Sequence, residues 1–358
     1  KGEKIEHKWN KIYKKKKIKM DKIFKNDFKR SVLKEKKIAL KEDKILASRK
    51  SSESIISSLV KKSNILIGGS ADLAGSNNTK TRNHKIITPG NFNGNYIHYG
   101  VREHAMCGIM NGLALHSKII PYGGTFLIFS DYCKPSIRLA AMMERQVIYV
   151  MTHDSIGLGE DGPTHQPIEQ LSGLRSIPNL NVFRPADRLE TIECWEHALK
   201  SSKTPSILSL TRQNLHPIRI KYSNTNKCSL GAYEVLRTNK KIKLTILASG
   251  SEVNLAIEAS HKLAKDRIYS KVISVPCMEL FDSQSGNYKN KILNETKLKI
   301  SIEAGSSDCW KKYVGDFGIT FGIDVFGKSA PYKDIYKYFG LISSNIVDKL
   351  KKRVKNQK

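Results

Sequence analysis

Several features are scarce or missing in this chain of 358 residues. The longest apolar runs, residues 119–121 and 147–151, fall far short of the roughly 18 residues that a membrane span requires. The amino end lacks the charged, apolar and small-residue order of a secretory signal, and no repeat of about 20–50 residues is found. We therefore expect a soluble protein with no membrane partner.

Cysteine is also sparse, and the cysteines are widely scattered along the chain. The six cysteines, at 107, 133, 194, 228, 277 and 309, form no Cys-x-x-Cys pair and fall mostly in apolar or mixed segments. This pattern is typical of buried free thiols in a reducing compartment, and we expect a cytoplasmic location. The first residue is Lys rather than Met, so we expect a further portion upstream.

Acidic residues are few: 33 Asp and Glu stand against 62 Lys and Arg, which gives a net charge of +29. Clustered Lys and Arg can bind nucleic acid. Residues 1–50 hold 20 Lys and Arg and 7 Asp and Glu, but the remaining excess is spread along the chain. Lys, Asn and Ile are abundant throughout, and no base-reading motif accompanies the charge. A compositional bias therefore explains the charge better than a nucleic-acid partner does.

The chain alternates between helical and strand patterns, which predicts an α/β fold of two consecutive domains, each a mainly parallel sheet flanked by helices. Residues 1–45 read as a basic connector, extended or partly helical. Residues 46–218 form the first predicted domain, 219–232 a linker, and 233–358 the second. We expect strands at 64–68, 147–151, 207–210, 244–248, 271–275, 299–302 and 319–322, and helices at 54–61, 103–116, 137–144, 189–199, 252–264 and 335–339.

Two segments hold the ionisable groups most suited to chemistry. Residues 99–106 read Tyr-Gly-Val-Arg-Glu-His-Ala-Met, and residues 152–167 read Thr-His-Asp-Ser-Ile-Gly-Leu-Gly-Glu-Asp-Gly-Pro-Thr-His-Gln-Pro. The second follows an apolar run, which is where a buried strand delivers side chains into a cleft. With Gly-Gly-Ser-Ala-Asp at 68–72 and Pro-Tyr-Gly-Gly-Thr-Phe at 121–126, these segments closely resemble transketolase, a thiamine-diphosphate enzyme, from about Arg49 to about Asp348.

The resemblance covers the pyrimidine-binding and C-terminal domains of that family. It implies transfer of a two-carbon ketol unit between sugar phosphates in the pentose phosphate pathway, and a homodimer with the active site at the subunit interface. The family's N-terminal domain, which binds the cofactor's diphosphate and Mg²⁺ or Ca²⁺, has no counterpart in this chain. We expect the chain alone to be incomplete for activity, and no metal ligand is assigned within it.

Glu103 begins a predicted helix. Most acids at such a position only complement the helix dipole. The resemblance implies a larger role, in which Glu103 exchanges a proton with the aminopyrimidine of the cofactor. On the same helix, Ala105, Gly108 and Gly112 share a face, and either close packing within the domain or the subunit interface would explain them.

Three aromatic residues follow Gly123-Gly124, which we interpret as a turn. Phe126, Phe129 and Tyr132 would share a face if this segment is helical. Such a stripe is usually core. The resemblance instead implies an aromatic pocket for the aminopyrimidine, and it places Asp72 near the thiazolium ring. An Asx turn that ends a strand is the structural alternative for Asp72.

His153, Asp161 and His165 lie on a Gly-rich loop after a strand. A metal site is one alternative, but the two histidines are far apart in sequence and no cysteine is near. The resemblance implies that His153 and His165 are catalytic residues that bind the carbonyl and hydroxyl groups of the sugar. It assigns Asp161 to a hydroxyl of the acceptor.

Arg49, Ser76 and Arg212 match the phosphate-binding residues of the family. The planar fork of arginine binds phosphate oxygens with two hydrogen bonds. Arg49 lies among many Lys and Arg and could equally be a solvated surface charge. Arg212, which follows an apolar strand, is the more specific signal for a sugar phosphate.

Two other functions would use part of the same residue pattern. The β chain of a 2-oxo-acid dehydrogenase E1 component has the same two-domain layout, but a 2-oxo acid needs neither Arg212 nor Asp161. A non-catalytic remnant or binding subunit could use the basic N-terminal segment, but it would have no use for Glu103 and the aromatic pocket. The second domain has no comparable cluster, and Gly250-Ser251-Glu252 is interpreted as structural.

Overall fold

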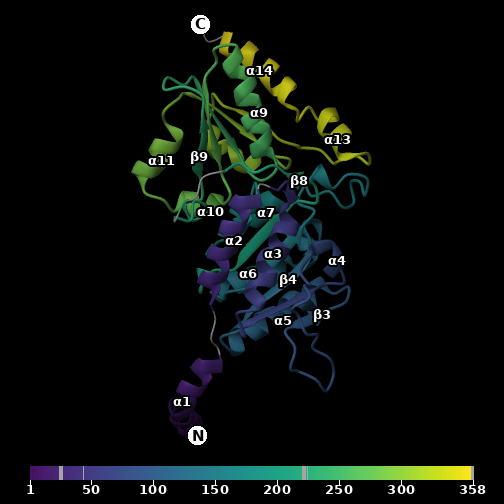
Figure 1. Ribbon diagram of the computed structural model, residues 1–358, viewed down its shortest axis with the longest axis vertical. Coiled ribbons are helices and arrows are strands. Elements are labelled where there is room, and N and C mark those ends of the chain that lie inside the picture. The colour runs from purple at the N-terminus through teal and green to yellow at the C-terminus, as the bar shows by residue number, and fades with distance from the viewer. Residues whose placement is uncertain (24–26, 43, 220–222, 224, 356–358) are drawn as a thin grey trace.

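The computed structural model describes residues 1–23, 27–42, 44–219, 223 and 225–355. Two sheets, each with its own helices, lie one beyond the other along the long axis of the molecule (Figure 1). The predicted α/β fold of two mainly parallel sheets is confirmed. None of the described helices is long and apolar enough to cross a lipid bilayer.

The first sheet has six strands in the order β3-β2-β4-β5-β7-β6, and every neighbouring pair is parallel. Its strands are β2 (Leu66–Ser70), β3 (Tyr96–His98), β4 (Ile120–Phe126), β5 (Ile148–Thr152), β6 (Asn181–Phe183) and β7 (Ser206–Leu210). Its longer helices are α3 (Ser48–Val60), α5 (Glu103–His116), α6 (Ser130–Met142) and α8 (Arg188–Lys200), and α4 (Ala74–Asn77) and α7 (Gln170–Arg175) are short. A two-stranded ribbon, β1 (Leu46–Ala47) with β8 (Asn214–Leu215), lies beside it.

Alternate residues of the central strand supply two separate cores. Ile148 and Val150 of β5 pack in the layer with α3 and α8, whereas Tyr149 and Met151 pack in the layer with α5 and α6. Because side chains alternate across a strand, a strand covered on both faces must be apolar throughout. All five residues of β5 are buried, which explains the unbroken apolar run in the sequence.

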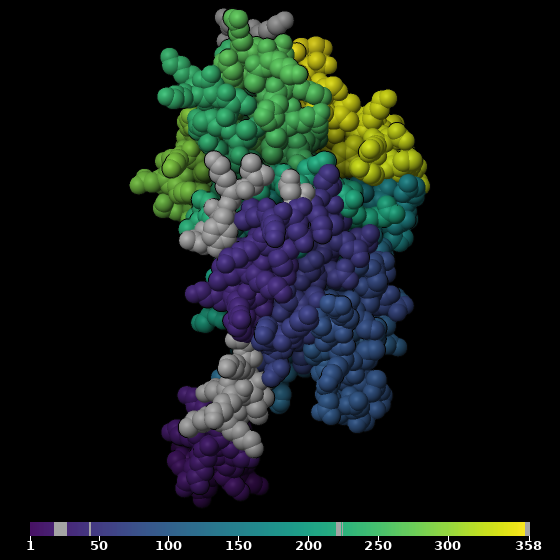
Figure 2. Space-filling view, viewed as in Figure 1, coloured from purple at the N-terminus to yellow at the C-terminus, as the bar shows by residue number. Residues whose placement is uncertain are grey.

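The N-terminal segment is more regular than the sequence indicated. It forms two helices, α1 (Gly2–Ile23) and α2 (Phe28–Glu42). Val32 of α2 is buried in the core with α3 and α8, and Lys36 forms an ion pair with Glu196 at 2.8 Å. The abundant lysines hid this packing, because α2 has a low mean hydropathy. By contrast, α1 projects from the end of the first body (Figures 1 and 2).

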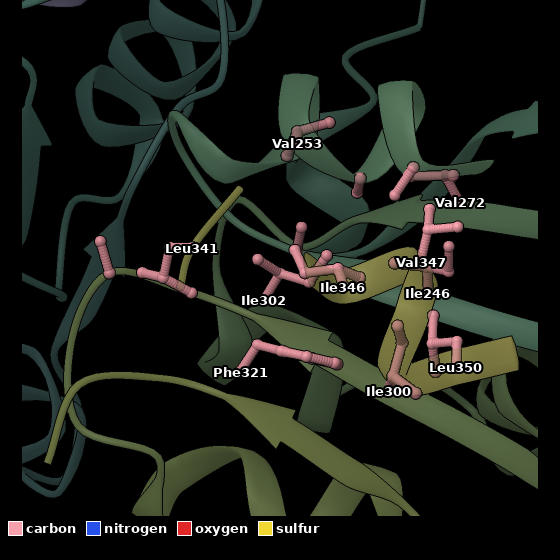
Figure 3. Packing of buried hydrophobic residues seen from close by; sticks show 14 of the residues in the cluster. Ile246, Val253, Val272, Ile300, Ile302, Phe321, Leu341, Ile346, Val347 and Leu350 are labelled. Carbon is pink, nitrogen blue, oxygen red and sulfur yellow. The ribbon is translucent and has the colours of Figure 1, made fainter. Parts of the chain in front are cut away.

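The second sheet has the order β13-β12-β10-β11-β9, in which β9 is antiparallel to its neighbour. Its strands are β9 (Tyr233–Arg237), β10 (Leu244–Ala248), β11 (Ser270–Ser274), β12 (Leu298–Ile302) and β13 (Ile319–Phe321). Its helices are α9 (Glu252–Lys265), α10 (Met278–Asp282), α11 (Gly286–Leu293), α12 (Lys311–Val314), α13 (Tyr332–Tyr338) and α14 (Ser343–Lys355). Figure 3 shows Ile246 and Ile300 of the strands packed with Ile346 and Leu350 of α14.

The two bodies meet around one fully buried guanidinium. Arg184, directly after β6, donates to Asp154 Oδ2 at 2.9 Å and to the carbonyl oxygen of Ser249 at 2.9 Å, and it also pairs with Glu252. Glu303 of the second body in turn accepts two hydrogen bonds from Arg175, at 2.7 and 2.8 Å. Burial raises the pKa of the Glu303 carboxyl, but Arg175 and Arg184 outweigh it and hold the pKa at about 2.

This network also gives Gly250-Ser251-Glu252 its structural role. Gly250 has a φ of +54°, and its backbone N–H donates to the carbonyl oxygen of Arg184 at 3.0 Å. A Cβ at Gly250 would lie 2.8 Å from the Arg184 side chain. The absence of a side chain at Gly250 therefore leaves room for the buried guanidinium.

We expect the Arg184→Met substitution to lower the free energy of unfolding by about 3–5 kcal/mol, because it leaves Asp154 and Glu252 buried without their cation. Urea unfolding followed by circular dichroism measures the change. The control is Arg237→Met, which removes half-exposed pairs with Glu234 and Glu295 and should cost at most about 1 kcal/mol. Equal losses in the two variants would contradict a special role for the Arg184 network.

Candidate active site

The site lies where three neighbouring strands end at one edge of the first sheet. Strands β2, β4 and β5 end at Ser70, Phe126 and Thr152, and Phe126 pairs in register with Thr152. The carboxyl ends of parallel strands meet at the same edge, so the residues that follow them share one crevice. This edge carries His153, Phe126 and Asp72.

His153 is held rigidly at this edge. Only 4% of its surface is exposed, its φ is +60°, and its ring stacks on the ring of Phe126 with 3.8 Å between centroids. Burial, together with the positive charges of Arg49 and Arg212 and the neighbouring His165, lowers the pKa of His153 from 6.5 to about 3. The imidazole is therefore neutral at physiological pH.

The three predicted aromatic residues do lie together. The rings of Phe126 and Phe129 are stacked, 5.7 Å apart and 11° from parallel, and the ring of Tyr132 lies 5.9 Å from that of Phe129. His165 packs edge-on against Phe129 at 5.7 Å. Tyr132 is 65% exposed, so one end of this stack is open to a ligand or a partner.

The local structure behind this stack differs from the prediction. Gly123 and Gly124 do not form a turn but lie within β4, where a Cβ on Gly123 would come 2.4 Å from the sulfur of Met110. Nor is the aromatic segment a single helix. Phe126 ends the strand, Phe129 lies in the 3-10 turn η1 (Leu127–Phe129), and Tyr132 lies in the first turn of α6. A tight strand-to-helix turn gives nearly the same spacing as a helix.

Two arginines from distant segments converge beside His153. Arg49 Nη1 donates to the carbonyl oxygen of Ser76 at 2.7 Å, and Arg212 Nη1 donates to the carbonyl oxygen of Leu158 at 2.9 Å. Burial and the charge of Arg212 lower the pKa of Arg49. Arg212 also forms an exposed ion pair with Glu160 at 3.8 Å, and two neighbouring guanidiniums favour a further anion between them.

The loop that carries Asp161 and His165 is fastened to the second body. Gln166 Nε2 donates to the carbonyl oxygens of Gly159 and Lys328, each at 2.9 Å. The Ser329 hydroxyl donates to the carbonyl oxygen of Glu160. The segment 327–329 therefore fixes the path of the loop, while the side chain of Asp161 is exposed and faces solvent.

Glu103 and Asp72 lie at the same sheet edge but outside the contacts just described. Glu103 begins α5 and is 9% exposed, and its carboxylate has no hydrogen bond or ion pair within the described ranges. Asp72 is exposed with a φ of +60°, and within the described residues its carboxylate accepts no hydrogen bond from the N–H of Ala74, two residues on. The Asx turn considered for Asp72 is therefore not formed.

The small residues of α5 do not pack inside the domain. A Cβ added to Gly108 or Gly112 would meet nothing within 4 Å. The neighbouring Ile109 and Leu115 are 48% and 50% exposed. Close packing within the domain, one of the two explanations of these glycines, is therefore wrong.

Sequence reasoning missed the residues that support the site. Asn77, Thr152, Asp154 and Arg184 are all buried around the strand ends, and Gln166 anchors the loop. Thr152 and Asp154 flank His153, so a polar residue on each side of a buried histidine was the available signal. Asn77 and Arg184 belong to no motif, and only the fold brings them here.

The site fits one half of thiamine diphosphate and not the other. The stacked rings of Phe126 and Phe129 suit a flat aminopyrimidine, which needs an aromatic face, and the Glu103 carboxylate at the start of α5 could serve as its proton partner. For a diphosphate-bound metal the described residues offer no suitable group of three or more His, Cys, Asp or Glu.

Comparison with known proteins identifies both bodies. Residues 44–217 match the transketolase pyrimidine-binding domain, and residues 231–342 match the transketolase-like C-terminal domain. The transketolase of Sinorhizobium medicae is 49% identical over 303 residues, which cover 84% of this chain and 44% of that protein. The chain spans about half the length of the curated relatives it matches.

Solved structures give the same result. A transketolase of Pichia stipitis, in complex with sedoheptulose-7-phosphate, superposes with a TM-score of 0.87 at 38% identity, covering 98% of this chain and 53% of that one. A split-gene transketolase, described as an inactive β4 tetramer, is similar only in fold, with a TM-score of 0.70 at 19% identity over 87% of this chain and 99% of that one.

The protein thus has a pyrimidine-binding domain and a second α/β domain, which holds the loop of Asp161 and His165 by hydrogen bonds. It belongs to the transketolase family, and the described chain contains that family's pyrimidine-binding and C-terminal domains.

We expect Gly327→Ala to loosen the loop of Asp161 and His165. The added Cβ would come 1.7 Å from Gln166 Oε1, and Gln166 cannot move away without losing its bonds to Gly159 and Lys328. Overpacking of this kind costs about 1–3 kcal/mol. Hydrogen exchange at residues 159–166 should become faster.

The matched control is Gly286→Ala in the same body, where a Cβ meets nothing within 4 Å. That variant should leave exchange in the loop unchanged. Loop exchange in Gly327→Ala at the rate of the control would show that segment 327–329 does not hold the loop.

Proposed function

We propose that this chain provides the aminopyrimidine and sugar-phosphate sites of a transketolase, which transfers a two-carbon ketol unit from a ketose phosphate to an aldose phosphate. One observation carries the proposal. Arg49 and Arg212, from segments far apart in sequence, converge beside a neutral, buried His153 that is stacked on the aromatic cluster. The paired arginines suit the phosphate of a sugar, and His153 suits its oxygen atoms. The aromatic cluster suits a flat cofactor against which the sugar would lie.

Each residue has a distinct part in this function. Phe126, Phe129 and Tyr132 would hold the aminopyrimidine ring, Glu103 would share a proton with it, and Asp72 would face the thiazolium. When bound, thiamine diphosphate supplies the carbon nucleophile that attacks the ketose carbonyl. The neutral ring of His153, with His165, binds the carbonyl and hydroxyl oxygens of the sugar and orients them.

The phosphate end of the sugar belongs to Arg49, Ser76 and Arg212. An anion between the two guanidiniums relieves their mutual repulsion and satisfies N–H groups that otherwise have few acceptors. Asp161, exposed on the loop, is free to accept a hydrogen bond from a hydroxyl of the acceptor.

Two parts of the site come from outside the described domains. The diphosphate and its Mg²⁺ or Ca²⁺ require ligands from a further domain, whether on the same polypeptide or on another. The exposed face of α5, with Gly108, Ile109, Gly112 and Leu115, supports a homodimer in which Glu103 lies at the subunit interface. Glycines on a helix surface let two helix backbones approach closely.

The β chain of a 2-oxo-acid dehydrogenase E1 component is a weaker alternative. Such a chain would also use Glu103 and the aromatic cluster. It has no need for the paired guanidiniums of Arg49 and Arg212 beside His153, because a 2-oxo acid carries no phosphate. A non-catalytic remnant or binding subunit does not explain the unpaired carboxylate of Glu103.

We expect Glu103→Gln to lower ketol transfer by roughly 100- to 10,000-fold in the assembled enzyme, because the amide cannot exchange a proton with the aminopyrimidine. The measurement is turnover of a ketose phosphate and an aldose phosphate with thiamine diphosphate and Mg²⁺. The control is Asp334→Asn, an exposed acid in the first turn of α13, which should retain full activity. Full turnover by Glu103→Gln would remove this residue from the mechanism.

We expect Arg212→Met to raise KM about 10- to 100-fold for a phosphorylated ketose and much less for its unphosphorylated analogue, because only the former loses a charge-assisted hydrogen bond. Arg145→Met, at an exposed arginine outside the site, should change neither value. A similar rise in KM for both sugars would mean that Arg212 acts by holding the Leu158 carbonyl rather than by binding phosphate.

A further inference from the structure

A line of buried polar side chains runs behind His153. The Ser70 hydroxyl lies 3.2 Å from Asn77 Oδ1, Asn77 Nδ2 donates to Thr152 Oγ1 at 2.7 Å, and Thr152 Oγ1 lies 2.8 Å from His153 Nδ1. Ser70, Asn77 and Thr152 have no exposed surface. Ser70 and Thr152 lie within the sequence motifs but have no role assigned there, and Asn77 belongs to no motif.

The hydrogen-bond partners of the Thr152 hydroxyl determine which ring nitrogen of His153 carries the hydrogen. The Thr152 hydroxyl accepts from the Asn77 amide, and its own hydrogen has a single acceptor within the described chain, His153 Nδ1. The opposite arrangement, with Nδ1–H donating to Thr152, would leave a buried hydroxyl hydrogen without an acceptor. Buried polar groups are rarely left unpaired.

The orientation of the Asn77 amide sets the direction of these hydrogen bonds. Ser70 Oγ accepts from the N–H of Leu73 at 3.1 Å, so its hydrogen points toward its oxygen neighbours, Asn77 Oδ1 at 3.2 Å and the Gly124 carbonyl at 3.1 Å. The structure assigns Oδ1 to the Ser70 hydroxyl and the amino group of Asn77 to Thr152; a reversed amide would turn the Thr152 hydroxyl toward Asn77 and place the ring hydrogen of His153 on Nδ1, so the tautomer reports which orientation is present.

We propose that Asn77 and Thr152 are positioning residues that hold His153 in the neutral tautomer with its hydrogen on Nε2. The stack on Phe126 fixes the plane of the ring, and the Thr152 hydroxyl fixes its rotation. Nε2 then donates a hydrogen bond to an oxygen of the sugar and cannot act as a base toward it. The role of the tautomer in sugar binding rests on the proposed function; the tautomer itself does not.

Nuclear magnetic resonance of the chain labelled with ¹⁵N at histidine tests the tautomer directly, with His153→Asn to assign the signal. In the wild type and in Thr152→Ser, which keeps the hydroxyl, Nε2 should be protonated and Nδ1 unprotonated. In Thr152→Val, which keeps the shape and loses the hydroxyl, the preference should weaken or reverse. A protonated Nδ1 in the wild type would overturn the proposal.

The chain offers a matched control. Thr125 is a fully buried threonine on the neighbouring strand β4, pairs in register with Met151, and has no hydrogen-bond partner for its hydroxyl within the described residues. Thr125→Val should therefore leave the His153 signal as in the wild type. An equal change in both valine variants would show that repacking, not the lost hydroxyl, alters the ring.

Activity of the assembled enzyme gives the second readout. Thr152→Val should lower kcat about 10- to 100-fold, as loss of a partner that orients a functional histidine does elsewhere, with a smaller effect on KM. Thr152→Ser should restore most of it. If the wild-type ring has the expected tautomer but the assembled enzyme shows no ketol transfer, the proposed function is wrong and the tautomer assignment still holds. If Thr152→Val transfers the ketol unit at the wild-type rate, the positioning role of Thr152 is wrong and the proposed function still holds.

Discussion

Arg184 is the interaction on which the relative placement of the two bodies depends. Its guanidinium is completely buried between Asp154 of the first body and Glu252 of the second. Asp154 directly follows His153, so the ion pair that joins the bodies also fixes the backbone of the histidine. Leaving a buried cation without its partners strongly lowers the free energy of unfolding. The contacts of Arg184 with the two bodies should therefore form together or be lost together.

Burial and neighbouring charges also set the protonation state of the site. Burial and two nearby arginines keep His153 neutral, while those arginines remain cations that attract an anion. A neutral imidazole beside a cationic pair can bind an oxygen without competing for the phosphate. The described residues of the second body contribute no side chain to this chemistry, yet the Lys328 carbonyl and the Ser329 hydroxyl hold the loop that carries Asp161 and His165. The second body therefore affects the site by keeping this loop in place.

Much of the fold could be predicted because local patterns were strong. Helix α5 and strand β10 were predicted with the bounds that the structure has, since each is a sharply bounded apolar segment. Helix α2 was underestimated, because its exposed lysines masked a narrow buried stripe around Val32. The Gly123-Gly124 stretch was misread as a turn, because glycine also occurs in strands where another side chain, here Met110, approaches too closely for a Cβ.

The sequence by itself determined the α/β class and the residue types of the site, because strand periodicity and short motifs are local properties. It also singled out Glu103, His153, Arg49 and Arg212. Only the tertiary structure decided which of them meet, since convergence depends on strand order and on loop paths set by distant contacts. The Asn77–Thr152–His153 line and the Arg184 network appear only there, because hydrogen-bond partners far apart in sequence leave no periodic trace.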